Sequence, residues 1–266
     1  MKNTIENKFM KKSEELSRRE LFGFFGKATG AVALLSAGKS GGLISNARAA
    51  GAPGEVNLPK AFVYTELQID MSFKKVPWRD LNSSISSQAG LLNKTWFAGV
   101  GNNSVGGIYS FKSIEDAQRY CTVFFPDLAK KLGVAQTTRI FDGSVVKDAS
   151  FGMNSPHFGV KPEQRPGAFV YTEVQVNVPF DRAPWKSRNP VLQQQKGLIS
   201  KLWLSGLNTH TLGGIDAFDT IENAKEFAIH VFPKTAKKLN AAFYTRIFDA
   251  QATELASREM KSPYYI

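Results

Sequence analysis

The stretch Ala61-Phe-Val-Tyr-Thr-Glu66 opens a pattern that returns 107 residues later as Ala168-Phe-Val-Tyr-Thr-Glu173. The correspondence runs without a gap to Thr138-Arg-Ile-Phe-Asp142 and Thr245-Arg-Ile-Phe-Asp249, with 36 of 82 aligned positions identical. So many identities at one offset indicate an internal duplication, and the period is that of a small domain rather than of a solenoid repeat. The sequence therefore predicts two similar domains fused into a covalent pseudo-dimer.

Each copy carries strand and helix signals in the order βαββαβ. In the first copy, alternation predicts a strand over 61–70, and an apolar helical face spans 78–88. Strands are expected at 91–98, 105–111 and 134–142, with a helix that starts at an N-cap, Ser113, is broken by Pro126 and continues over 127–132. This order is that of the ferredoxin-like split unit, an antiparallel sheet with two helices on one face. We expect the two open sheet faces to bury each other, which gives an α+β fold built as a fused barrel.

The chain divides into five parts on these signals. We assign 1–49 to a leader, 50–142 to the first ferredoxin-like repeat, 143–166 to a linker, 167–249 to the second repeat and 250–266 to a tail. The Gly, Pro, Ser and Asn content of 143–166 is typical of a linker. The tail either packs across a domain edge or is disordered, and its sequence leaves both open.

Composition excludes several classes of protein. The apolar and charged fractions, 42% and 21%, are those of a globular chain. The net charge of +11 falls to about +6 without residues 1–49, which hold nine Lys/Arg and four Asp/Glu. No basic stripe with interleaved aromatic residues is present, so we expect no nucleic-acid partner. The single cysteine, Cys121, lies in an apolar helical pattern and is expected in the core.

The first fifty residues read as a targeting segment. Ser17-Arg18-Arg19-Glu20-Leu21-Phe22 precedes a mildly apolar run over 21–38, and Ala47-Arg48-Ala49 has the form of a signal-peptidase site. The run is too short and polar for a stable membrane span. Paired arginines before a weakly apolar run resemble a twin-arginine signal, although the order Leu-Phe departs from the usual Phe-Leu. The resemblance implies export of the folded protein to the periplasm by the Tat translocase; the alternative is an ordinary secretory leader or a disordered basic tail.

Two acid–phenol pairs are the candidate catalytic residues. Glu66 and Glu173 sit mid-strand, each two residues from a tyrosine on the same face, Tyr64 and Tyr171 respectively. A carboxylate that burial has made more basic could remove a proton from an acidic C–H or O–H. The alternative is that each carboxylate pairs with a basic residue, and the candidates are Arg139 and Arg246.

Further residues are candidates for ligand binding. Trp96 and Trp203 could stack on a flat molecule, although strand aromatics at this spacing usually belong to the core. Asn103 and His210 occupy equivalent loop positions before the Gly-Gly pair, and each is otherwise a solvated loop residue. Arg139 and Arg246 complete the candidate ligand-binding set. The sequence contains no zinc-type Cys/His cluster, phosphate-binding loop or dinucleotide fingerprint.

Several motifs in order resemble a known family. Gly90-Leu-Leu-Asn-Lys-Thr-Trp96, Gly106-Gly107-Ile108-Tyr-Ser-Phe111, Leu132-Gly133-Val134 and Arg139-Ile-Phe-Asp142 are similar to those of the YdhR-like putative monooxygenases, which belong to the dimeric α+β barrel superfamily. The resemblance covers both repeats. It implies metal-free oxygenation of an aromatic or quinol-like small molecule, with the name resting largely on fold analogy.

The resemblance leaves two other functions open. One is a non-catalytic periplasmic protein that binds a small hydrophobic or aromatic molecule, because no complete catalytic constellation is present. The other is a haem protein, since the superfamily includes haem-binding members and His230 lies on a predicted helix. No second histidine supports haem, because His157 lies in the predicted linker, so we expect no cofactor.

Overall fold

The strand order is the same in both repeats. A computed structural model describes residues 58–176 and 178–266. The first sheet has the order β2-β3-β1-β4 and the second β6-β7-β5-β8, with all recorded pairs antiparallel. The two sheets and their helices confirm the predicted α+β ferredoxin-like fold. The strands are β1 (Ala61–Leu67), β2 (Leu91–Ala98), β3 (Val105–Phe111), β4 (Gln136–Asp142), β5 (Ala168–Gln175), β6 (Leu198–Ser205), β7 (Thr211–Phe218) and β8 (Phe243–Asp249).

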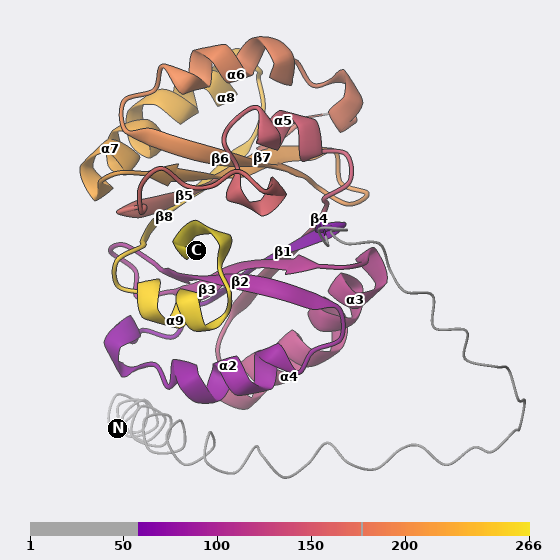
Figure 1. The fold of residues 1–266 in the computed structure, drawn as a ribbon, viewed down its shortest axis with the longest axis vertical. Coiled ribbons are helices and arrows are strands. Elements are labelled where there is room, and N and C mark those ends of the chain that lie inside the picture. Colours follow the sequence, from indigo (N-terminus) through magenta and orange to yellow (C-terminus); the bar gives the residue numbers. More distant parts are fainter. Residues whose placement is uncertain (1–57, 177) are drawn as a thin grey trace, which may run out of the picture. The chain divides into compact units, whose positions relative to one another are not determined.

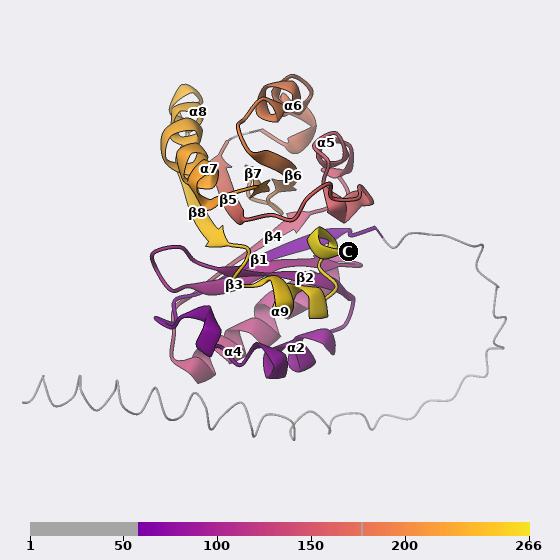
Figure 2. The same ribbon diagram turned by 60° about the vertical axis from the view of Figure 1, so that its left-hand side comes forward.

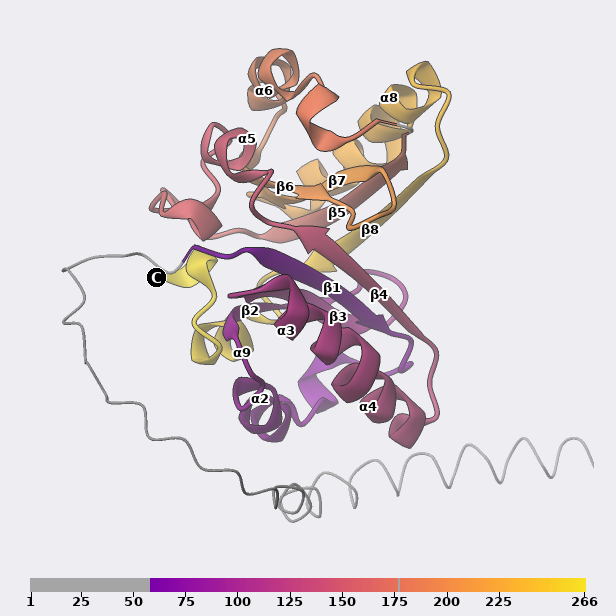
Figure 3. The same cartoon turned by 90° about the vertical axis from the view of Figure 1, so that its right-hand side faces the viewer.

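The longer helices lie on the outer faces of the sheets, so the sheets face each other at the centre (Figure 1). Turning the molecule shows the helices along the outside of both sheets (Figure 3). In the first repeat these helices are α2 (Trp78–Ser86), α3 (Ile114–Arg119) and α4 (Phe125–Leu132). Their counterparts in the second are α6 (Trp185–Gln193), α7 (Ile221–Glu226) and α8 (Phe232–Lys238).

The inner faces of the sheets form one shared aromatic core. Alternation along β1 turns Phe62 and Tyr64 toward the other sheet, and both belong to a buried cluster that also holds Phe169 and Tyr171. Phe97 stacks on a phenylalanine of the second repeat, Phe248, at 4.5 Å between ring centroids. Each fully buried phenylalanine side chain contributes about 1.5–3 kcal/mol. This cluster buries the inner faces of the two sheets against each other, as the sequence predicts.

Backbone bridges join the two sheets at both sides and close the barrel. Gly99, just past β2, pairs with Phe248 of β8, and Phe141 of β4 pairs with Gly206, just past β6. The Val100 N–H donates to the carbonyl of Ile247 at 2.9 Å, and an equivalent bond of 2.9 Å joins Leu207 to Ile140. One end of each edge strand therefore continues its ladder into the opposite sheet.

The Gly-Gly pairs permit a close approach between central strands. A Cβ on Gly106 would lie 1.9 Å from the carbonyl oxygen of Thr65, and one on Gly213 would lie 1.9 Å from that of Thr172. No side chain fits at either position. The close approach of the neighbouring strand therefore requires glycine at both positions.

The long helix of the first repeat is continuous, so the predicted break at Pro126 is wrong. Between α3 and α4 the backbone forms one π-helical turn, Tyr120–Phe124, in which the Phe125 N–H donates to the carbonyl of Tyr120. Pro126 then occupies the first turn of α4. A proline is tolerated there because the first N–H groups of a helix need no intrahelical acceptor. The second repeat has the same π turn at Phe227–Val231.

The segments after β4 and after β8 are ordered and exchanged between the repeats. Within the predicted linker, α5 (Lys147–Phe151) lies against β6 of the second repeat, and in the predicted tail α9 (Glu254–Glu259) lies against β2 of the first (Figures 1 and 2). Of the two alternatives for the tail, packing across a domain edge is the correct one. We call these two segments, 147–158 and 254–265, the crossed clasps.

The crossed clasps satisfy the outer edges of β2 and β6. The Trp96 N–H donates to Ser257 Oγ at 2.9 Å, and the Trp203 N–H donates to Ser150 Oγ at 2.9 Å. The next N–H groups along these edges, those of Lys94 and Lys201, donate to the carbonyls of Met260 and Met153. Unpaired strand edges are sites of aggregation, so each clasp protects the sheet of the other repeat.

The leader expected over 1–49, including Arg18 and Arg19, lies outside the described residues. Among residues 58–176 and 178–266, no helix is both long enough and apolar enough to cross a membrane.

We expect the clasp serines to be important for stability. Ser150→Ala and Ser257→Ala each leave a buried strand N–H without an acceptor, so each should lower the free energy of unfolding by about 1–3 kcal/mol in urea titrations. The matched control is Ser187→Ala, because the exposed Ser187 hydroxyl bonds only within its own helix; it should change stability by less than about 0.5 kcal/mol. Equal stability of all three variants would contradict the clasp.

Candidate functional site

Glu66 lies fully buried on the inner face of β1 and accepts several hydrogen bonds. The Tyr64 hydroxyl donates to Oε2 at 3.0 Å, and the Tyr244 hydroxyl donates to the same oxygen at 2.9 Å. Arg246 Nε lies 3.3 Å from Oε1. Tyr244 and Arg246 both come from β8, so the second repeat supplies most of the donors to this carboxylate.

Glu173 occupies the equivalent position on β5 and is less enclosed. Tyr171 donates its hydroxyl to Oε2, and Arg139 Nε of the first repeat lies 3.4 Å from the same oxygen. No hydrogen bond from the described residues reaches the other oxygen, Oε1. The Glu173 side chain is 12% exposed, whereas that of Glu66 is 0% exposed.

The two halves cross over at the centre of the barrel. Each glutamate pairs with one of the two arginines that the alternative interpretation named, and the structure shows that this arginine belongs to the other repeat. Tyr64 stacks on Tyr171 with 4.1 Å between ring centroids and 10° between ring planes. The structure therefore brings together six of the predicted site residues, Tyr64, Glu66, Tyr171, Glu173, Arg139 and Arg246, and adds Tyr244. We call these seven side chains the central cluster.

The phenols of the central cluster are hydrogen-bond donors rather than bases. Burial, with the negative charge of Glu66, raises the pKa of Tyr64 well above its ordinary value. Burial and the charge of Glu173 do the same to the pKa of Tyr171. Burial and Glu66 raise the pKa of Tyr244 to about 12. All three hydroxyls stay protonated at neutral pH, so a carboxylate must accept any proton that a substrate releases here.

The expected rise in the pKa of Glu66 does not occur. Burial raises the pKa, but hydrogen bonds from Tyr244 and Tyr64, the nearby hydroxyl of Ser104 and the charge of Arg246 outweigh it and lower the pKa below its ordinary value. A carboxylate held in its charged form by so many donors is a weak base. Two of these partners, Tyr244 and Arg246, come from the other repeat; Arg246 was a predicted candidate, whereas Tyr244 was not.

One substitution makes the two halves unequal. Tyr244 of β8, which donates to Glu66, corresponds by the 107-residue offset to Thr137 of β4. No phenol from β4 therefore reaches Glu173. Glu173 therefore has one phenol donor fewer than Glu66. Tyr171 and Arg139 meet at the same oxygen of Glu173, whereas Tyr64 and Arg246 meet different oxygens of Glu66.

The tryptophans lie on the other face of each sheet. Trp96 is buried, and its Nε1–H donates to Asn82 Oδ1 of α2 at 2.8 Å. Trp203 makes the same bond of 2.9 Å to Asn189 of α6. Both indoles therefore anchor helices to sheets in the core, and they do not join the central cluster.

The predicted loop residues are also apart from the central cluster. Asn103 is exposed and its amide lies 3.4 Å from the carboxylate of Asp70. His210 is exposed, has a left-handed backbone (φ 51°), and lines a shallow hollow of about 440 Å³. His230, in the π turn that follows α7, is exposed and lies 4.0 Å from Glu226 of α7.

His157, which the sequence placed in a linker, is a core residue. It is 5% exposed, and its Nδ1 lies 3.1 Å from Ser110 Oγ. Burial lowers the pKa of His157 to about 3, so the imidazole is neutral. The signal that could have shown its setting is a repeat of Ala-Ser-x-x-Met-x-Ser-Pro at 149–156 and 256–263, which continues the duplication into both clasps.

Within the described residues, no three His, Cys, Asp or Glu side chains gather as ligands for a metal ion. His230, the candidate haem ligand, is exposed on the helix surface.

Comparison with known proteins supports the resemblance that the motifs gave. Residues 64–151 match the model of the family described as putative mono-oxygenase ydhR. The first repeat is YdhR-like. The matched stretch runs from Tyr64 through the first clasp helix, so it holds Glu66 and Arg139 of the central cluster. A search of curated proteins gave no match.

Solved structures show weaker likenesses. A putative monooxygenase from Lactobacillus acidophilus is 10% identical to this chain. The alignment covers 71% of this chain and 92% of that protein, with a TM-score of 0.40. An anthrone oxidase-like protein is 12% identical, with coverages of 73% and 92% and a TM-score of 0.43. A chlorite dismutase from Candidatus Nitrospira defluvii is 7% identical, with coverages of 75% and 96% and a TM-score of 0.40. These identities and TM-scores are low, and the fold is defined by the strand order of the two sheets.

A second difference between the repeats is at Tyr109 and Asp216, equivalent positions that each lie beside a buried lysine. In the second repeat, buried Lys201 donates to both oxygens of Asp216, at 2.8 and 3.1 Å. In the first repeat, Lys94 is 1% exposed, and Tyr109 stands in place of the aspartate. The Lys94 Nζ lies over the rings of Tyr109 and Trp96, and burial lowers its pKa well below the ordinary value.

We expect opposite effects from removing the two lysines. Lys94→Met should raise the free energy of unfolding by about 1–3 kcal/mol, because it removes a buried amine that, unlike Lys201, pairs with no carboxylate of the described residues. Lys201→Met should lower it by about 3–5 kcal/mol, because it leaves the Asp216 carboxylate buried and unpaired.

The pH dependence gives a second measure of Lys94. Because its folded-state pKa is lowered, the unfolded chain binds the extra proton between that pKa and about 10.4. Stability of the parent protein should therefore rise with pH across this window, and Lys94→Met should lack that rise. Identical pH profiles in chemical denaturation would show that Lys94 is not buried as described.

Proposed function

We propose that the chain is an exported monooxygenase-like protein that acts, without a metal, on an aromatic or quinol-like small molecule at the Glu173 half of the central cluster. The observation that carries this proposal is the free oxygen of Glu173. Oε1 accepts no hydrogen bond from residues 58–176 and 178–266, the side chain is partly exposed, and a phenol and a guanidinium hold the other oxygen. A general base needs a lone pair that its substrate can reach. The family match over the first repeat supports the reaction class.

The chemistry assigns a separate role to each residue. Glu173 takes a proton from an acidic C–H of a CH2 group flanked by aromatic rings. Arg139, which is 46% exposed, is placed to stabilise the anion that forms. The carbanion passes electrons to dioxygen; one oxygen atom becomes the carbonyl of the product, and the other leaves as water. The CH2 group supplies all four electrons, so no other reductant takes part.

Glu66 has a structural role in this scheme. Both its oxygens accept hydrogen bonds, and its pKa is lowered. Tyr64, which donates to it, supports the ring of Tyr171 by stacking. The first half of the central cluster therefore holds the second half in position.

A second candidate function is binding without reaction. The crossed ion pairs account for both carboxylates as interface contacts, with no need for turnover. In that case the protein would retain an aromatic molecule through purification and leave it chemically unchanged in air. Native mass spectrometry before and after aerobic incubation distinguishes this function from the first.

Paired glutamine substitutions test the assignment of roles. Glu173→Gln should lower turnover by about 100-fold or more, because the amide cannot accept the proton. Glu66→Gln should instead lower the free energy of unfolding by about 1–3 kcal/mol and retain most of the turnover. Dioxygen uptake with a panel of hydroquinones and of aromatic ketones with a benzylic CH2 gives the rates. Turnover that survives Glu173→Gln would overturn the proposal.

The proposed export depends on the paired arginines. Arg18→Lys combined with Arg19→Lys should leave the protein in the cytoplasm, because the twin-arginine route requires the pair, whereas a general secretory leader tolerates lysine. Cell fractionation and immunoblotting measure the distribution. Unchanged periplasmic protein would indicate the general secretory route.

A further inference from the structure

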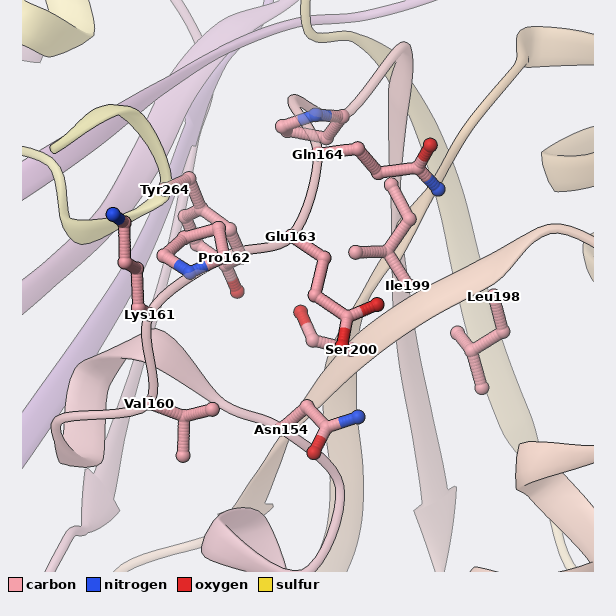
Figure 4. Close-up of a pocket in the computed structure, with 11 residues that line it drawn as sticks. Asn154, Val160, Lys161, Pro162, Glu163, Gln164, Leu198, Ile199, Ser200 and Tyr264 are labelled. Carbon is pink, nitrogen blue, oxygen red and sulfur yellow. The ribbon is translucent and has the colours of Figure 1, made fainter.

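A small cavity lies where the segment between the repeats crosses β6 and meets the second clasp (Figure 4). Its volume is about 200 Å³, and its walls come from 160–166, from the first residues of β6 and from Tyr264. None of these residues belongs to the central cluster. A cavity of roughly 150 Å³ holds one benzene ring, so this one has room for a single ring with small polar substituents.

Two buried hydroxyl groups line this cavity without a partner. Ser200 is 3% exposed and Tyr264 is 2% exposed, and neither hydroxyl oxygen has a hydrogen-bond partner in the part of the chain that the structure describes. In Figure 4 both side chains point into the space between 160–166 and β6. Buried hydroxyls are normally satisfied, so two at one cavity indicate a missing ligand or ordered water.

An irregularity in β6 creates the cavity wall. The register of β6 against β7 shifts between Leu198 and Ser200. In a regular strand, consecutive side chains point to opposite faces, but here Leu198, Ile199 and Ser200 all line the cavity. Bulges re-aim side chains in this way and are common beside binding sites.

The ring of Tyr264 is held in place by neighbours from both repeats. It makes edge contacts with His157 at 5.4 Å and with Phe169 at 4.8 Å between centroids. Burial, together with the nearby charge of Asp216, raises the pKa of Tyr264, so its hydroxyl stays protonated and can donate. A fixed donor of this kind costs little entropy when it binds a ligand oxygen.

The walls define the class of ligand. Leu198, Ile199 and Pro162 offer apolar surface for the faces of a ring, while the two hydroxyls offer one hydrogen bond each. Lys161 and Glu163 are both exposed and carry opposite charges, so the charges of the lining cancel and a ligand without net charge is favoured. Asn154 and Gln164 add exposed amide groups to the lining. We propose that this cavity binds a neutral single-ring phenol or quinone, whose oxygens pair with Ser200 and Tyr264.

This inference does not rest on the reaction proposed at Glu173. Binding is measured without turnover, so the failure of one proposal leaves the other intact. Glu173→Gln protein should bind the ring as the parent does.

Titration with hydroquinone under anaerobic, reducing conditions, followed by NMR, tests the site. Ser200→Ala and Tyr264→Phe should each weaken binding by about three- to tenfold, the range for one lost hydrogen bond. Tyr265→Phe is the matched control, because the neighbouring Tyr265 hydroxyl already donates to the carbonyl of Ala250 at 3.1 Å. It should bind hydroquinone within twofold of the parent. Thermal melting of each variant verifies that it is folded.

Three results would overturn the proposal. They are the absence of saturable binding by the parent protein, equal affinities in Ser200→Ala and Tyr265→Phe, and equal binding of cyclohexane-1,4-diol, which has the oxygens but not the aromatic ring. The first would mean that ordered water satisfies the hydroxyls.

Discussion

The edge strands β2 and β6 cannot complete their hydrogen bonding within their own repeat, and the rest of the structure depends on this constraint. Each edge receives its acceptors from the other repeat, through Ser257 and Met260 on one side and Ser150 and Met153 on the other. The clasps then fix how the sheets face each other, and that arrangement brings Arg246 to Glu66 and Arg139 to Glu173. The polar centre of the barrel is thus a product of the same exchange that protects its edges.

Duplication has allowed the two halves to differ while the frame stays the same. Tyr244 replaces Thr137, and Asp216 replaces Tyr109; Leu202 replaces Thr95, whose hydroxyl bonds the clasp residue Ser262. The last change leaves Ser155, the counterpart of Ser262, without a partner. In a symmetric dimer of one short chain, both subunits would have the same residue at each of these positions. A fused chain can occupy one carboxylate fully and leave its counterpart accessible.

The repeating pattern of 61–142 was enough to predict the sheets, their order of elements and the faces of β1 and β5, because strand alternation and the 107-residue offset are both local or periodic signals. Prediction failed where the partner of a residue lies in the other repeat. The pKa of Glu66 falls because Tyr244 and Arg246 arrive from β8. His157 is buried because the two clasps meet at its ring and that of Tyr264. Pro126 continues a helix because a π turn precedes it.

The crossed clasps also set an order in time. The acceptor of the Trp96 N–H, Ser257 Oγ, lies 161 residues later in the chain. The acceptor of the Trp203 N–H, Ser150 Oγ, lies 53 residues earlier. During synthesis, the second repeat therefore meets a clasp that is already present, while β2 stays open until Ser257 has left the ribosome. Contacts of such long sequence separation form slowly. The first repeat is made first but is completed only after the second clasp, so its β2 edge stays open while the 161 residues that follow Trp96, up to Ser257, are made.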